Sequence, residues 1–200
     1  MESENIIYPC EGNTPVNMFP KLKPNCKIRL LADLVPTNDI TIKNDSTIPN
    51  PSMILRTVAR AKYRSIINLS NWYFQIRVAP ADETRNTIKT PFRTFACKII
   101  EQGDTNAPST AMRVMEYILD GLIGKTVWEY LDDSIIFSDS FENHVLDIRQ
   151  VRVCQRSQDH NIRASPSQCN FFADKLPLLG HVIDDQGIHA DPEKIPGIQD

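Results

Sequence analysis

Apolar and polar residues alternate along the middle of the chain with the two-residue period of a strand. In "RSIINLSNWYFQIRV", this alternation puts Ile67 and Leu69 on one face, and Ile66 and Asn68 on the other. A break and a helical turn follow. Asn68 is therefore expected near the end of a strand.

A helix with one buried face is predicted from Asn106 onward. Pro108 suits its first turn, and Gly124 can cap its end. Its apolar positions recur at intervals of three and four residues, at Ala111, Val114, Met115, Ile118, Leu119 and Leu122.

Two β-rich runs, "TVWEYL" and "SIIFSD", enclose Asp132 and Asp133. This pattern predicts a hairpin with the two aspartates as its two-residue turn, so that both carboxylates lie at the tip. A second helix is predicted to begin at Ser140 as its N-cap and to end by about His160 or Asn161. Its expected buried residues are Phe141, Val145, Ile148 and Val151.

The rest of the chain is less regular. Residues 1–64 are rich in proline, asparagine and short apolar pieces, which predicts an irregular lobe with "KIRLLADL" as its one clear strand. "PNPSMILRTVARAKY" predicts a short helix opened near Ser52, and "LPLLGHVIDDQGI" predicts a further hairpin.

The order strand, helix, hairpin, helix, strand is typical of an α+β layer with helices on one face of a sheet. This layout would bring Asn68 and Asp132 together.

Composition indicates a globular chain. It has 200 residues, of which 41% are apolar and 24% charged. We find no signal peptide or transmembrane pattern, and we expect an intracellular protein of the cytoplasm or nucleus that contacts no membrane. The net charge of −3 gives no overall attraction to nucleic acid, so binding a polyanion would need local basic patches.

The five cysteines are odd in number and include no C-x-x-C pair, which indicates reduced thiols. A zinc site is the alternative for two of them. Its ligands would be Cys154, His160, Cys169 and His181, but their spacing matches no zinc finger or knuckle, so we do not predict zinc.

Several motifs taken together resemble a known family. "EYLDDSIIFSDSFENHV" is similar to the Y-x-D-D hairpin of reverse transcriptases, and "SPSQCNFFADKLPLLGHVIDDQGIHADPEKI" is similar to the part that follows it in gypsy-type long-terminal-repeat retrotransposon polyproteins. "KIRLLADLVPTND", "SIINLSNWYFQIRV", "IKTPFRTF" and "QGDTNAPST" precede them in the family's order. The resemblance covers residues 19–200.

The resemblance implies a right-hand polymerase fold of fingers and palm, with an antiparallel palm sheet backed by helices. The expected division is 1–64 N-terminal segment and fingers, 65–78 first palm strand, 79–105 fingers, 106–185 palm, and 186–200 the start of the thumb connection.

The implied chemistry is attack of a primer 3′-hydroxyl on a deoxynucleoside triphosphate, directed by an RNA or DNA template. Two Mg²⁺ ions, or Mn²⁺, would assist by clamping the attacking and leaving oxygens. Asp132 and Asp133 match the metal-binding and catalytic hairpin pair, but the third carboxylate of the family falls on Asn68. Because asparagine is neutral, this copy is expected to bind metal weakly and to be impaired.

Other positions take roles that the resemblance implies. Arg29 matches the residue that contacts the triphosphate, Tyr73 the steric gate against the deoxyribose, and Gln102 with Gly103 the turn near the nucleotide. Outside the motifs these residues would be interpreted as a solvated charge, a core tyrosine and a loop. A basic cluster suits template phosphates or is a solvated face; it comprises Arg56, Arg60, Lys62 and Arg64.

Two further hypotheses belong to other classes of protein. The chain could be a non-catalytic nucleic-acid-binding remnant of a decayed or truncated element, or an unrelated acidic hairpin that binds calcium. The sequence does not predict an oligomeric state.

Further departures from the family favour decay of the element. Glycine, arginine, glycine, methionine and lysine are expected where the chain has Cys26, Thr37, Arg93, Ile100 and Gln168.

The decay hypothesis predicts the codons at three positions. Aspartate to asparagine at Asn68, glycine to arginine at Arg93 and methionine to isoleucine at Ile100 are each one G-to-A transition. We expect the coding sequence to show codons one such change from the ancestral ones. Codons further away would remove the argument for directional mutation.

Overall fold

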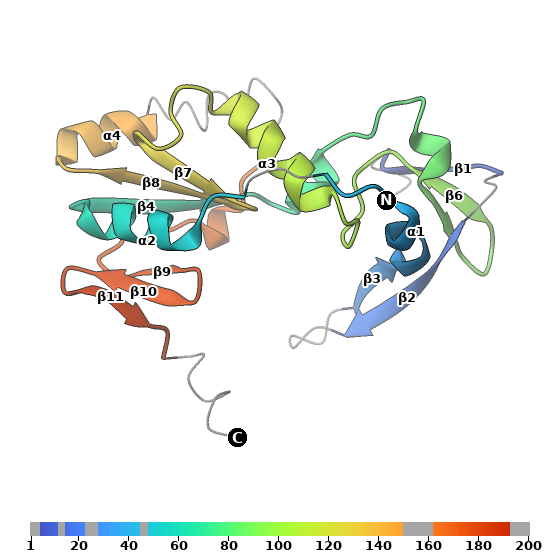
Figure 1. The fold of residues 1–200 in the computed structure, drawn as a ribbon, viewed down its shortest axis with the longest axis horizontal. Coiled ribbons are helices and arrows are strands. Elements are labelled where there is room, and N and C mark those ends of the chain that lie inside the picture. The colour runs from blue at the N-terminus through green and yellow to red at the C-terminus, as the bar shows by residue number, and fades with distance from the viewer. Residues whose placement is uncertain (1–4, 12–14, 23–27, 45–47, 150–161, 193–200) are drawn as a thin grey trace. The chain divides into compact units, whose positions relative to one another are not determined.

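The computed structural model describes residues 5–11, 15–22, 28–44, 48–149 and 162–192. The chain divides into two compact units (Figure 1). The first unit comprises residues 1–45 and 71–111, and the second comprises 46–70 and 112–200. The predicted assignment of these stretches to fingers and palm stays a prediction. No helix among the described residues is long and apolar enough to cross a membrane.

The first unit is built on a five-stranded sheet with the order β1-β6-β5-β2-β3. Neighbouring strands are antiparallel except β2 and β5, which are parallel. The strands are β1 (Ile7–Pro9), β2 (Val16–Leu22), β3 (Ile28–Ala32), β5 (Thr87–Lys89) and β6 (Thr94–Cys97). Helix α1 (Val35–Ile40) and the short 3₁₀ helices Trp72–Gln75 and Glu83–Arg85 complete the unit.

The prediction that the N-terminal lobe is irregular and has a single clear strand is wrong, because β1 and β2 are also strands. Strand β2 contains Pro20, which interrupts the strand pattern in the sequence. Proline is tolerated there because β2 pairs with β5 only at Val16 and Asn17, so the edge of β2 beyond them needs no further N–H donors. Strand β2 is stabilised by pairing with β3, the next strand in the sequence, and with the distant β5.

The second unit contains two three-stranded sheets, with the orders β4-β8-β7 and β11-β10-β9. The strands are β4 (Tyr63–Asn68), β7 (Val127–Tyr130), β8 (Asp133–Ser138), β9 (Leu176–Leu178), β10 (His181–Asp184) and β11 (Gly187–Ala190). The helices are α2 (Pro51–Arg60), α3 (Ala107–Ile118), whose first turn belongs to the first unit, α4 (Phe141–Arg149) and the 3₁₀ helix Pro166–Gln168.

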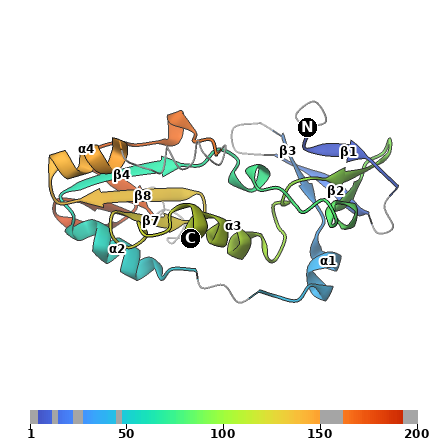
Figure 2. The same ribbon diagram turned by 90° about the horizontal axis from the view of Figure 1, so that it is seen from above.

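Helices cover both faces of the β4-β8-β7 sheet, so the prediction of helices on one face is incomplete. Helices α3 and α4 lie on one side, as expected, but α2 and the β9–β11 sheet cover the other (Figures 1 and 2). The second face is apolar because Ile66 and Ile135 pair directly across the strands. They join one core cluster with α2 and the small sheet, through Ile54, Val58, Leu176 and Ile183.

The ends of the helices follow from local chemistry. Asn50, two residues before the predicted start at Ser52, caps α2 by accepting a hydrogen bond from the Ser52 N–H at 2.9 Å. Helix α3 buries Ala111, Met115 and Ile118 as predicted, and also Met112; Leu119, just after the helix, is buried as predicted. Gly124 does not cap α3, which ends at Ile118. Its φ of +77° places it in the turn before β7.

Helix α4 begins as predicted but buries a different residue. Ser140 Oγ accepts a hydrogen bond from the Asn143 N–H at 3.2 Å, which confirms the N-cap. Phe141, however, is 51% exposed, whereas His144 is fully buried. The predicted burial of Phe141 is therefore wrong, and Val145 and Ile148 are half-buried. Val151 and the predicted end at His160 or Asn161 lie outside the described residues.

His144 is buried because its ring connects α4 to both central strands. Its Nε2 lies 2.8 Å from Ser65 Oγ on β4, and its Nδ1 lies 3.0 Å from Ser138 Oγ on β8. Ser138 Oγ donates to Asp147 Oδ2 at 2.6 Å, so Nδ1 is the donor to Ser138 and Nε2 accepts from Ser65. The Phe172 ring packs edge-on against the imidazole. The neutral ring is thus fully satisfied.

This network predicts an acid-sensitive contribution to stability. Burial lowers the pKa of His144 below its usual 6.5, while Asp147 opposes this shift. As the pH falls below about 6.5 the unfolded chain therefore binds the proton first, and the free energy of unfolding decreases. We expect His144→Asn to remove that decrease, measured by urea unfolding between pH 5 and 8.

His181→Asn, on β10, is the matched control and should keep the wild-type pH profile. An unchanged profile in His144→Asn would contradict the assignment of the acid sensitivity to this ring.

Candidate active site

Asn68 and Asp133 face each other across the ends of β4 and β8. The register pairs them directly, as the last residue of one strand and the first of the other. Tyr130 pairs with Asp133 on the other side, so the hairpin turn is Leu131–Asp132. The predicted Asp132–Asp133 turn is therefore shifted by one residue, because Asp133 already belongs to β8.

The structure brings the three polar side chains together, as the topology predicts. Asn68 Nδ2 donates to Asp133 Oδ1 at 2.9 Å and approaches Asp132 Oδ2 at 3.4 Å. The amide thus directs its two protons toward the two carboxylates. This orientation places the positive partial charge of the amide protons against the anionic oxygens.

The Leu131–Asp132 turn has a backbone conformation that is unfavourable for a residue with a side chain. Leu131 has a φ of +59°, a region that a branched residue rarely adopts. Its N–H donates to Met112 Sδ at 3.4 Å, and the Leu69 N–H donates to the Asp132 carbonyl at 2.8 Å. Strand β4 and helix α3 therefore fix the hairpin tip.

The two carboxylates differ in environment. Asp132 is exposed and Asp133 is half-buried. Burial raises the pKa of Asp133, the hydrogen bond from Asn68 lowers it, and the charge of Asp132 raises it again. A cation bound between the two aspartates would oppose both effects that raise the pKa.

The donor set can be tested against the Mg²⁺ that the resemblance implies. Two adjacent carboxylates, together with Asn68 Oδ1 after rotation of the amide, offer hard oxygen ligands for one divalent ion. No group of three or more His, Cys, Asp or Glu side chains suited to a metal occurs within the described ranges. The donor chemistry of the residues therefore suits a hard divalent cation.

Glu129 is a buried acid near the site that the sequence interpretation missed. It is fully buried on β7, and its Oε2 accepts a 2.5 Å hydrogen bond from Ser134 Oγ, while its Oε1 has no hydrogen-bond partner among the described residues. Burial raises the pKa of Glu129 to about 8, with smaller raising contributions from Asp133 and Asp132. The sequence pattern could have indicated that Glu129 is buried, because alternation along the strand places Glu129 on the same inward face as Val127.

The basic cluster is divided by the fold. Arg64 is 4% exposed, and its guanidinium donates to the Val58 and Ala59 carbonyls and to Asp185. It therefore caps the end of α2 and does not lie on the surface with the others. Arg56, Arg60 and Lys62 are exposed, and the two arginines line a groove along α2.

The predicted nucleotide contacts all belong to the first unit. Arg29 pairs with Lys21 in the β2–β3 register, and its side chain lies outside the described part. Tyr73 and Gln102 are half-buried. Gly103 has a φ of +103°, a backbone conformation that favours glycine, and its carbonyl accepts a hydrogen bond from Asn38 Nδ2.

One of the departures from the family, Arg93 in place of glycine, lies in a described turn. Arg93 is not among the residues with positive φ, so the arginine causes no left-handed backbone strain there. Its N–H donates to Thr90 Oγ1 at 3.2 Å. Cys26 lies outside the described residues.

Comparison with known proteins identifies the fold and then the family. The chain superimposes over its whole length on 34% of a foamy viral protease-reverse transcriptase in complex with double-stranded DNA, with a TM-score of 0.89 and 18% identity. Its fold is therefore that of a reverse transcriptase. The model of the family "Reverse transcriptase (RNA-dependent DNA polymerase)" matches residues 21–183. The chain belongs to this family.

Two relatives from Drosophila melanogaster agree. The chain is 31% identical to the retrovirus-related Pol polyprotein from transposon gypsy over 86% of its length, and 31% identical to that from transposon 297 over 94%. It spans only 16% and 18% of these polyproteins. The resemblance to gypsy-type elements is thus confirmed.

Glu129 predicts an unusual dependence of stability on pH. The folded state keeps the proton up to about pH 8, whereas the unfolded chain loses it near pH 4.5. The free energy of unfolding should therefore decrease as the pH rises between these values, by up to about 1.4 kcal/mol per unit. We expect Glu129→Gln to abolish this decrease, measured by denaturant unfolding from pH 4.5 to 8.5.

Glu116→Gln, an exposed change on α3, should leave the decrease in place. If Glu129→Gln shows the same slope as the wild type, the carboxyl is ionised in the folded state and its assignment as a neutral acid is wrong.

Proposed function

We propose that this chain is the fingers and palm segment of a retrotransposon reverse transcriptase whose polymerase site is impaired. The observation that carries the proposal is the Asn68 amide, which donates to Asp133 at 2.9 Å and approaches Asp132 at 3.4 Å. In this proposal the three side chains stand for a site of three acids, one of which is replaced by a neutral donor.

The consequence for metal binding is electrostatic. Asparagine keeps the shape of aspartate but removes one negative charge and one anionic oxygen. Asp132 and Asp133 would hold a divalent ion, Mg²⁺ or Mn²⁺, which when bound stabilises charge on the attacking and leaving oxygens of phosphoryl transfer. If the missing ligand costs about 4 kcal/mol or more, the rate falls roughly a thousandfold or further.

The remaining residues would position the substrates. Exposed Arg56, Arg60 and Lys62 suit the phosphates of an RNA or DNA template-primer, which they would hold by charge without reading sequence. Arg29, Tyr73, Gln102 and Gly103 take the role of contacts to the deoxynucleoside triphosphate. The foamy viral reverse transcriptase, which has the same fold, has been solved with double-stranded DNA and with RNA/DNA hybrid.

A non-catalytic nucleic-acid-binding role is the second candidate. Asn68 donates hydrogen bonds to both Asp133 and Asp132, so the hairpin tip is connected to β4 through protein groups. Arg56 and Arg60 remain exposed beside the groove along α2. These features would support binding of a nucleic acid without phosphoryl transfer.

Restoring the carboxylate tests the proposal. We expect the purified chain to extend a primer on an RNA template slowly or not at all with Mg²⁺, and Asn68→Asp to raise the rate about a thousandfold. Asn143→Asp, an exposed change on α4, is the matched control and should leave extension unchanged. Direct Mn²⁺ titration should show tighter binding by Asn68→Asp.

The other outcomes separate the candidates. Robust primer extension by the unmodified chain would contradict the proposal that its polymerase site is impaired. Nucleic-acid binding that is weakened by Arg56→Ala and Arg60→Ala but not by Arg149→Ala on α4, with no extension even by Asn68→Asp, would favour the binding role.

A further inference from the structure

A pocket of about 440 Å³ lies at the end of the β4-β8-β7 sheet that is remote from the hairpin tip. Strand β8 runs from Asp133 at the tip to Ser138 in the pocket wall, so these two residues lie about 17 Å apart. The pocket is therefore separate from the candidate active site. All of its lining residues belong to the second unit, and its volume lies in the range of small-molecule sites.

This pocket continues the groove along α2. Thr57 and Arg60 line both hollows, so the groove leads along the helix into the pocket. Arg56 and Arg60 are one helical turn apart, about 6 Å along the axis, and lie on the same face of α2. Lys125, exposed in the turn before β7, adds a third cation in the pocket wall. A positively charged groove of this kind suits the backbone of a single nucleic-acid strand.

The pocket also holds a carboxylate that is available to a ligand. Asp139 follows β8 and is exposed, and within the described ranges its side chain forms no hydrogen bond or ion pair. The second acid in the wall, Asp147, differs because Ser138 Oγ donates to its Oδ2 at 2.6 Å. Asp139 is therefore the acceptor that a ligand in the pocket would meet.

A carboxylate can select among the bases through its two acceptor oxygens. Guanine carries two adjacent donors, N1–H and the N2 amino group, on its Watson–Crick edge, and can donate to both oxygens at once. Adenine, cytosine and uracil each place an acceptor beside their donor, which a carboxylate repels. Because base pairing occupies this edge, it is free only in an unpaired nucleotide.

We propose that a single strand of nucleic acid follows Arg56, Arg60 and Lys125 and places one unpaired guanine in this pocket, where Asp139 accepts hydrogen bonds from its N1–H and N2 amino groups. The inference rests on the nucleic-acid binding by Arg56 and Arg60 proposed above, and it adds selection of a base. The cations hold phosphates and carry no sequence information, whereas the carboxylate does. Asp139 is thus a specificity-determining residue.

The test measures binding of fluorescein-labelled RNA strands of about twelve nucleotides to the full chain by fluorescence anisotropy. One strand is all uridine, and the others carry one central guanosine, adenosine, cytidine or inosine. We expect the guanosine strand to bind roughly ten- to hundredfold more tightly than the uridine strand. Inosine, which lacks the N2 amino group, should lose much of this gain, and a complementary strand that pairs the guanosine should remove it.

Exchange of the carboxylate for an amide should change which base is preferred. Asp139→Asn should lose the preference for guanosine and gain one for xanthosine, whose C2 carbonyl accepts a hydrogen bond from the new amide. A merely structural role of Asp139 would not produce this exchange. Asp174→Asn, which changes an exposed carboxylate outside the pocket, is the matched control and should keep the preference for guanosine.

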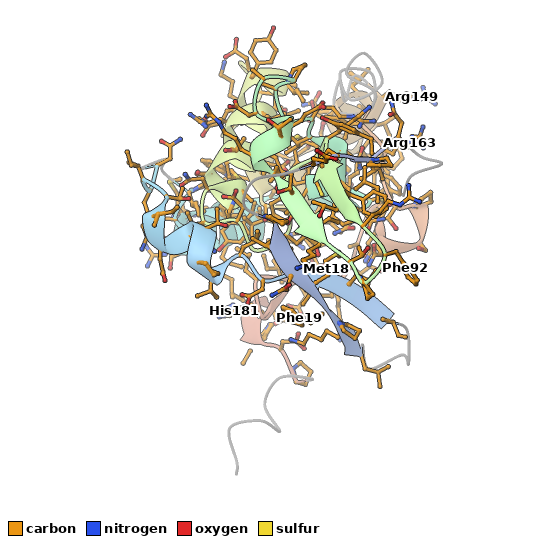
Figure 3. The ribbon with its side chains drawn as sticks, turned by 90° about the vertical axis from the view of Figure 1, so that its right-hand side faces the viewer. Met18, Phe19, Phe92, Arg149, Arg163 and His181 are labelled. Carbon is orange, nitrogen blue, oxygen red and sulfur yellow. The ribbon has the colours of Figure 1, made fainter. Side chains whose placement is uncertain are left out.

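The cation in the pocket has a matched control as well. Lys125→Ala should weaken all strands and reduce the slope of log K against log salt concentration by about 0.7 to 1. Arg149→Ala should change neither quantity. Arg149 is at the end of α4, and Figure 3 shows it on the opposite side of the second unit from His181 on β10.

The outcomes separate this inference from the function on which it rests. Equal binding of the guanosine and uridine strands, or an unchanged preference in Asp139→Asn, would overturn the inference. If binding still depended on Arg56 and Arg60, the proposed nucleic-acid role would stand. Absence of RNA binding would overturn both. Free guanosine monophosphate that competes as strongly as the guanosine strand would overturn the assignment to a strand, because the pocket would then take a free nucleotide.

Discussion

The candidate site depends on the register of β4 against β8. This register pairs Asn68 with Asp133 and leaves Asp132 in the turn, which places the amide 2.9 Å and 3.4 Å from the two carboxylates. A slip by one residue would turn every side chain to the opposite face and separate the three groups. The register is fixed because both faces of this sheet are covered, so that Ile66 and Ile135 must face the core of α2.

Around this pairing the second unit buries several polar groups. His144 is satisfied by serines on both central strands, whereas Glu129 has one oxygen bonded and one unpartnered. The two groups respond to pH in opposite directions, because burial disfavours the charged form of each and only the carboxyl is charged at high pH. In the first unit Glu101 is likewise a buried acid. Buried acids without full partners cost folding free energy.

The residues that the resemblance assigns to one reaction belong to two units. The carboxylates and the arginines of α2 lie in the second unit, and the nucleotide contacts lie in the first. The fold also separates Arg64 from the rest of the basic cluster, because Arg64 is buried and caps α2, whereas Arg56 and Arg60 are exposed. Basic residues that are close in sequence therefore differ in their surroundings.

The sequence by itself determined the elements with strong local periods and the position of the missing acid. The strand that ends at Asn68, the helix after Asn106, the Ser140 cap and the hairpin are visible from alternation and capping residues, and the ordered motifs indicate the family. Only the tertiary structure decided the turn at Leu131–Asp132, the strands β1 and β2, the burial of His144 in place of Phe141, and the role of Arg64. Strand β1, which pairs with β6, and His144, which contacts Ser65, depend on neighbours that are distant in sequence. A local period shows which face a side chain occupies but not what covers that face.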